Sequence, residues 1–306
     1  MQNKTFEFAL LGVLALLWGS SYMWMALALE TIPPLSLIAL RVFMAAGFLV
    51  CILAVRGINL PKDKKTWQQF FIQSIINSSG PWLLLAWGQQ YVDSAVASVL
   101  NSTSPLFVFF FAIFLLAKSD RPGTVQLLGA LAGVLGIVLI VGAGALDSFG
   151  EGFLPQLAVL LSAALYGVAA LRGRQFSHLP PMVTAAGTLI CAAVMLVPIS
   201  LIVDQPWQLD FSTSSLAAAG ILSLFCTAFA FLIYFRLLNT IGAMGTASQA
   251  YLRSGVGVVL GVVFLSETLD VETLIGICLA IAGVVLINWP RKPKHVTAVS
   301  TERENS

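Results

Sequence analysis

Long runs of apolar residues alternate with short polar stretches from residue 7 to residue 289. Most runs hold about 20 residues, the length that an α-helix needs to cross the hydrocarbon core of a bilayer. Transmembrane β-strands would instead alternate polar and apolar residues. The pattern predicts an all-α membrane protein with ten transmembrane helices, at residues 7–28, 35–55, 68–90, 94–117, 122–142, 154–173, 181–203, 213–235, 243–266 and 271–289.

Short sequences recur at a spacing of about 147 residues. Pro33-Pro34 returns as Pro180-Pro181, and Gly136 followed by Ile-Val-Leu-Ile returns as Gly283 followed by Val-Val-Leu-Ile. Each copy contains five predicted spans, so the second copy enters the membrane from the opposite side. Inverted repeats of this kind are typical of transporters that work by alternating access around a site near the middle of the bilayer.

The predicted domains are therefore two inverted five-helix repeats, 7–142 and 154–289. The polar segment 290–306 is expected to be a disordered cytoplasmic tail.

Composition supports a membrane protein and excludes several other classes. The chain has 306 residues, of which 58% are hydrophobic and 10% charged, and its mean hydropathy is +0.92. Soluble domains carry about 25% charged residues. The net charge of +2 argues against nucleic acid as a partner. No metal site or cofactor is expected, because the cysteines share no ligand-like spacing; they are Cys51, Cys191, Cys226 and Cys278.

The charged residues predict the orientation in the membrane. With the N-terminus inside, 14 of the 16 basic residues fall in cytoplasmic segments and none in outer loops, while the outer loops are acidic. The positive-inside rule then places both termini in the cytoplasm, in a multi-pass protein of the inner or plasma membrane. The two remaining basic residues, Arg41 and Arg253, lie within predicted spans.

Several motifs resemble the EamA branch of the drug/metabolite transporter superfamily. They are the Trp18–Ser21 stretch, Arg41 early in the second span, the small residues 97–100 ahead of Pro105-Leu106-Phe107, and the sequence 264–269 that ends the ninth span. The resemblance covers about residues 7–289. It implies a ten-helix, inverted-repeat carrier of small metabolites, often an exporter of amino acids or related compounds.

The chain departs from the family pattern at two positions. Lys118 stands where the family's glutamate falls in the first copy, and Ser254 replaces the family's proline in the second copy, directly after Arg253.

Arg253 is the leading candidate for substrate binding. It lies roughly 15 Å into the ninth span, near the bilayer centre. An arginine at that depth costs on the order of 2.5–3.5 kcal/mol and should face the bundle interior or water. No Asp or Glu lies at a comparable depth in any span. We therefore expect the substrate to supply the anion, the alternative being that Arg253 hydrogen-bonds backbone carbonyls and rigidifies the bundle.

Further candidates come from polar and aromatic residues within the spans. Gln249 lies one turn from Arg253, and the corresponding face of the fourth span carries Asn101; we expect the two faces to oppose each other. The third span is polar and contains a proline, which predicts a broken helix beside a cavity. The remaining candidates for the cavity wall are Asn77, Trp82, Trp18, Tyr166 and Tyr251. For all of these, helix packing or interhelical hydrogen bonding is the alternative reading.

Arg41 has a different expected role. It lies roughly 9 Å below the predicted outer surface. We expect it to reach outward to an acidic outer-loop partner such as Glu30, in a structural role.

The predicted function is transport of an amino acid or related carboxylate. An exchanger of organic anions or phosphorylated metabolites is the alternative. It is the less favoured of the two, because such sites typically present more than one basic residue to the cavity and only Arg253 clearly does so here. A membrane-embedded lipid-modifying enzyme is disfavoured, because no paired acids or nucleophile with its base are visible. With no Asp, Glu or His deep in a span, we expect transport without a carboxylate proton relay.

Glycine pairs at small-xxx-small spacing, 129 with 133 and 257 with 261, predict close helix contacts within one chain. A homodimer is the alternative.

Overall fold

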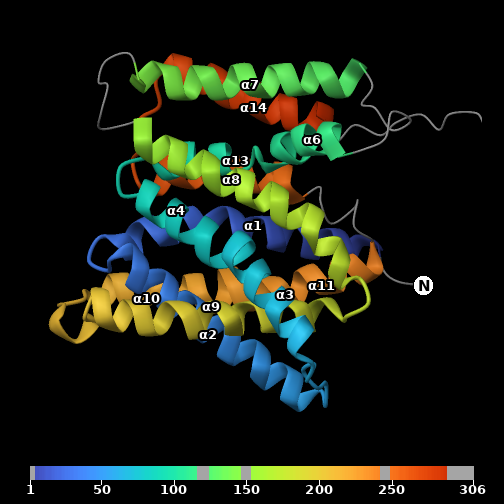
Figure 1. Ribbon diagram of the computed structural model, residues 1–306. Helices are drawn as coiled ribbons and strands as arrows, with labels where there is room; N and C mark the ends of the chain where they lie inside the picture. Colours follow the sequence, from blue (N-terminus) through green and yellow to red (C-terminus); the bar gives the residue numbers. More distant parts are fainter. Residues whose placement is uncertain (1–3, 116–123, 146–152, 242–248, 288–306) are drawn as a thin grey trace, which may run out of the picture.

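The computed structural model describes residues 4–115, 124–145, 153–241 and 249–287, which are helical and contain no strand (Figure 1). The helices up to residue 145 are α1 (Lys4–Leu29), α2 (Pro34–Val55), α3 (Lys64–Ser74), α4 (Gly80–Gly88), α5 (Ser94–Asn101), α6 (Ser104–Leu115) and α7 (Thr124–Ala145). Those that follow are α8 (Phe153–Gly173), α9 (Pro181–Val203), α10 (Thr213–Ser223), α11 (Ala230–Thr240), α13 (Gln249–Phe264) and α14 (Val271–Ile287).

Six helical stretches of the described chain are long and apolar enough to cross a bilayer. They are Thr5–Leu29, Pro34–Val55, Ser94–Phe111, Phe153–Gly173, Pro181–Val203 and Thr213–Leu237. Shorter apolar helices cover Thr124–Ile140, Leu252–Phe264 and Val271–Ile287. The sequence-based expectation of an all-helical, multi-pass membrane protein is thereby confirmed.

The third predicted span is a continuous helix, so the expectation that it is broken was wrong. A π-helical turn, η1 (Ile75–Ser79), joins α3 to α4, and Pro81 lies in the first turn of α4. The Gly80 N–H donates to the carbonyl of Ile75, five residues back. The longer hydrogen-bond spacing of the π-turn admits the proline without ending the helix.

A second π-turn, η5 (Leu224–Phe229), joins α10 to α11 in the same manner. Nothing in the sequence predicted it, because no proline marks the place. Its first residue follows that of η1 by 149 positions (224 − 75).

The fourth predicted span is divided into α5 and α6 by a turn at Ser102 and Thr103. Pro105 explains the interruption, because a proline has no N–H to donate to the carbonyl four residues earlier. The turn directly follows Asn101, a predicted site residue.

The helices pack in pairs whose members are far apart in the sequence. α7 lies along α14, and α2 packs against α9 (Figure 1). α1 contacts α13, α10 and α11. The α7–α14 contact is very close: a Cβ atom added to Gly136 would lie only 2.5 Å from the backbone nitrogen of Ala280. Glycines here let two backbones approach closely.

The predicted glycine pairs pack within the chain. A Cβ on Gly129 would meet α14, one on Gly133 would meet Leu106, and one on Gly257 would meet Ser98. The alternative of a homodimer stays a prediction.

Candidate functional site

A cavity of about 1000 Å³ lies between the helices. Helices from both halves of the chain line it, including α1, α2, α4, α5, α8, α9, α11 and α13. A volume of this size is typical of sites for small molecules.

Seven of the eight candidate residues from the sequence line this one cavity. They are Trp18, Asn77, Trp82, Asn101, Tyr166, Gln249 and Arg253. The side chain of the eighth, Tyr251, lies outside the described part of the structure. The structure thus brings the candidates together, and their part in binding a substrate stays a prediction.

Arg253 has few partners in the cavity wall. Its Nη2 group donates to the Ser102 hydroxyl over 3.5 Å, and its buried Nε has no partner among the described residues. Gln249 lies one turn away, is only 7% exposed, and its Oε1 is likewise unpartnered in the described chain. α13 packs against α5, which brings these side chains close to the turn after Asn101.

Arg41 belongs to the same cavity, which the sequence reasoning missed. It does not reach outward: it is 5% exposed, and its Nε donates to the Thr227 hydroxyl at 2.9 Å. Its guanidinium lies over the Trp82 ring, 4.0 Å from the centroid. The expectation of an outer-loop partner such as Glu30 was therefore wrong. Arg41 lies on the buried face of α2, and counting depth along the span could not reveal which face that was.

Several amide oxygens in the cavity wall are also unpartnered. Asn101 Nδ2 donates to the Tyr22 hydroxyl at 2.9 Å, and Gln73 Nε2 donates to the Ala169 carbonyl at 3.2 Å. The side-chain oxygens of both residues are buried without a partner in the described chain. Buried acceptors of this kind are costly unless something donates to them. The wall therefore offers acceptors as well as the two guanidiniums.

Two acidic side chains connect helices of the two halves at the predicted outer end of the molecule. Glu267 accepts from the backbone N–H and hydroxyl of Ser94, both at 2.7 Å, and from the N–H of Ala95 at 2.9 Å. Asp204 accepts from the backbone N–H of Ser36 at 2.8 Å and from its hydroxyl at 2.6 Å. Each carboxylate thus caps the N-terminus of a helix from the opposite half of the chain.

The opposite end of the cavity reaches the segment between α8 and α9, with the exposed Ser177 in its lining. At this predicted cytoplasmic end, Glu7 pairs with Arg236 at 2.8 Å and joins α1 to α11. The cavity therefore extends toward the predicted cytoplasmic side.

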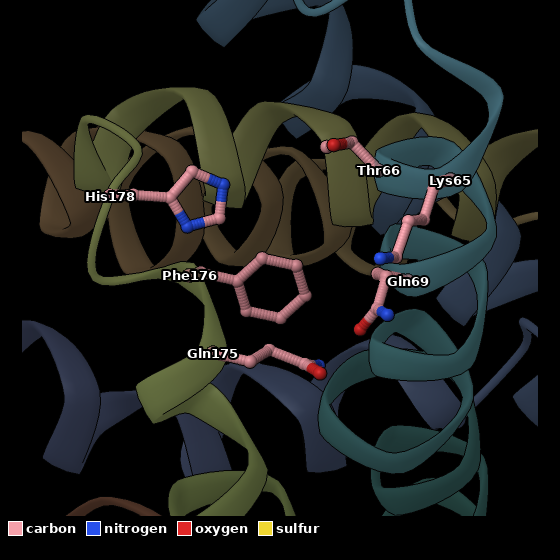
Figure 2. Close-up of a pocket in the computed structure, with 6 residues that line it drawn as sticks. All are labelled: Lys65, Thr66, Gln69, Gln175, Phe176 and His178. Carbon is pink, nitrogen blue, oxygen red and sulfur yellow. The ribbon is translucent and has the colours of Figure 1, made fainter.

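A smaller hollow of about 310 Å³ lies beside this mouth (Figure 2). Lys65 and Gln69 of α3 line one side, and Gln175, Phe176 and His178 line the other. Phe176 contributes to both hollows and stacks on Phe70, with ring centroids 5.5 Å apart. The ring thus forms part of the wall between them.

The chain is similar to a known family and to known proteins over most of its length. The model of the EamA-like transporter family matches residues 6–142 and 154–289. A Bacillus subtilis protein named "Uncharacterized transporter YoaV" is 27% identical over 90% of this chain and 95% of its own. The Escherichia coli protein named "Uncharacterized inner membrane transporter YedA" is 26% identical over 94% of this chain and 93% of its own.

A protein of known crystal structure shares the fold. It aligns with 92% of this chain and 97% of its own, with a TM-score of 0.65 and 20% sequence identity.

Proposed function

The chain belongs to the EamA-like transporter family, and from this premise we propose that it is a secondary transporter of a small amino acid or related carboxylate. The observation that carries the substrate class is the half-buried Arg253, whose buried Nε lacks a hydrogen-bond partner and which lines the cavity with no acidic partner among the described residues. A buried cation without a counter-ion is unfavourable. A substrate carboxylate supplies that counter-ion, and the guanidinium fork matches its two oxygens.

Transport proceeds by alternating access in a bundle of ten transmembrane helices arranged as two inverted repeats. Three features support this arrangement: the paired packing of α2 with α9 and of α7 with α14, the two matching π-turns, and the capping of α2 and α5 across the halves. The described conformation then corresponds to an inward-facing state, with the cavity reaching the cytoplasmic side. Both termini are cytoplasmic in this scheme.

Energy coupling does not use a carboxylate relay in the cavity. Glu7 and Glu267 are absent from its lining and are held by Arg236 and by the start of α5, respectively. Transport is driven by the substrate gradient, either as facilitated transport or as exchange.

Uptake by the purified full chain in liposomes tests this function. We expect uptake of at least one amino acid or small carboxylate from a screen, unaffected by an imposed pH gradient. Arg253→Gln should lower it by a factor on the order of ten or more, because the substrate loses a charged partner. Arg56→Gln, which changes an exposed arginine at the end of α2, is the matched control. Normal uptake by Arg253→Gln would remove this residue from the site.

A further inference from the structure

We propose that Arg41, held by Trp82 and Thr227, forms a second anion subsite and that the preferred substrate is a small organic dianion. This inference rests on the proposed function and deepens it. It makes the cavity a two-cation site, with Arg253 and Arg41 each binding one anionic group of the same molecule.

The contacts of Arg41 position it without neutralising it. Trp82 supports one face of the guanidinium, with the Cζ atom 4.0 Å from the ring centroid, and Nε is occupied by Thr227 at 2.9 Å. Within the described chain, no acceptor takes a hydrogen bond from Nη1 or Nη2. The terminal N–H groups thus remain available on a side chain that lines the cavity. A fixed guanidinium with free terminal donors suits a carboxylate or phosphate.

The charge of the cavity points to the same ligand. Among the residues that the structure describes, its lining contains two arginines and no acidic residue. Among the described residues, one ion pair is present, between Glu7 and Arg236, and neither residue lines the cavity. A zwitterion with one carboxylate would leave one buried guanidinium uncompensated, whereas a dianion would compensate both.

The two arginines lie at different depths. Counted along their helices, Arg41 is about 10 Å from the predicted outer end of α2, and Arg253 is about 17 Å from that of α13. The Tyr166 side chain lines the same cavity as both guanidiniums. A molecule with anionic groups at its two ends fits this placement better than one that carries both charges on a single group.

Binding measurements on the purified full chain can test the inference with ligand pairs of nearly equal size. Succinate and succinamate differ by one carboxylate, as do L-glutamate and L-glutamine, and O-phospho-L-serine tests phosphate as the second group. We expect the wild-type protein to bind at least one ligand with two anionic groups roughly tenfold more tightly than its partner with one. Arg41→Gln should reduce this ratio to about one while changing affinity for the ligand with one anionic group by less than about threefold.

Two controls separate a subsite from a structural role. Arg56→Gln should keep the wild-type ratio, and Thr227→Val should retain part of it, because the charge of Arg41 remains. If Arg41→Gln does not fold, Arg41→Lys replaces it and should lower the ratio through loss of the planar fork.

Each outcome decides the matter. Monoanion binding without a preference for the dianion, or an unchanged ratio in the Arg41 variant, would overturn the second subsite and leave the proposed function standing. Absence of both binding and transport for every carboxylate tested would overturn both.

Discussion

Glu267 shows how one residue can connect distant parts of the chain. Ser266, just before it, has a left-handed backbone with φ of 56°, which turns the chain after α13. The Glu267 carboxylate then caps α5, while Asp93, in the N-cap position of that helix, makes no capping bond with its side chain. Desolvation of the Asp93 carboxyl and, second, the negative charge of Glu267 raise the pKa of Asp93. The two acids thus compete at one helix end.

Replacing Asp93 with asparagine should therefore stabilise the protein. A carboxyl whose folded-state pKa is raised is penalised when ionised, so the penalty is present at neutral pH and is relieved as the pH falls through the raised pKa. We expect Asp93→Asn to raise the unfolding temperature in detergent at about pH 7.5 and to have much less effect at about pH 4. The exposed Asp210, changed to asparagine, is the control. A lower unfolding temperature at neutral pH would contradict this account.

Most candidate residues were predictable from the sequence, because a polar or charged side chain inside an apolar run must face protein or water. That reasoning led from Arg253 and Asn101 to residues that line one cavity. It failed for Arg41, since snorkelling and burial depend on the face of α2, which packs against α9. It also missed Gln73, which lies one turn from Asn77 on the same helix face.

At the scale of helices, close packing between α7 and α14 is a main contact between the two halves. A Cβ atom added to Gly283 would meet the backbone nitrogen of Gly133 and the carbonyl of Gly129. The recurrence of Gly136 and Gly283 in the sequence indicated a repeat, and the structure shows that both glycines serve this contact. The π-turns were not predictable, because the two turns share no residue pattern that distinguishes their hydrogen-bond spacing from that of an α-helix.

Gly283→Ala should accordingly destabilise the protein. Backbone atoms cannot yield as a flexible side chain can, so overpacking should cost about 1–3 kcal/mol and lower the unfolding temperature. Gly47→Ala in α2 is the matched control, since nothing lies within 4 Å of the added Cβ. It should be neutral or slightly stabilising, because alanine favours helix over glycine by about 1 kcal/mol. Equal unfolding temperatures for the two variants would refute the close-packing argument.

At the scale of the whole molecule, the distribution of basic residues and the open end of the cavity point to the same side of the membrane. The basic residues predict which side is cytoplasmic, and the cavity extends toward that side, past α8 to Ser177. The carboxylates of Asp204 and Glu267 hold the other side together. Most bounds of the described helices agree with the sequence-based prediction to within a few residues, because the apolar runs are bounded by polar residues that mark the helix ends.

Cysteine labelling in intact cells should establish the orientation. In a background with the exposed Cys51 and Cys278 changed to serine, Ser214→Cys should react with a membrane-impermeant maleimide from outside. Ser177→Cys should react only after permeabilisation. Both serines are exposed in the structure, so access to the reagent is limited only by the membrane. The reverse labelling pattern would invert the proposed topology.

The two π-turns have a geometric consequence for the cavity. One additional residue in a helical turn rotates everything that follows by about 100° around the helix axis. Trp82 follows η1, and Thr227 lies within η5, where its hydroxyl donates to the Leu222 carbonyl five residues back. The extra residue of each π-turn therefore sets the side of the helix on which Trp82 or Thr227 lies. Deleting one residue from either turn would rotate the cavity-facing side chain toward lipid without changing its chemistry.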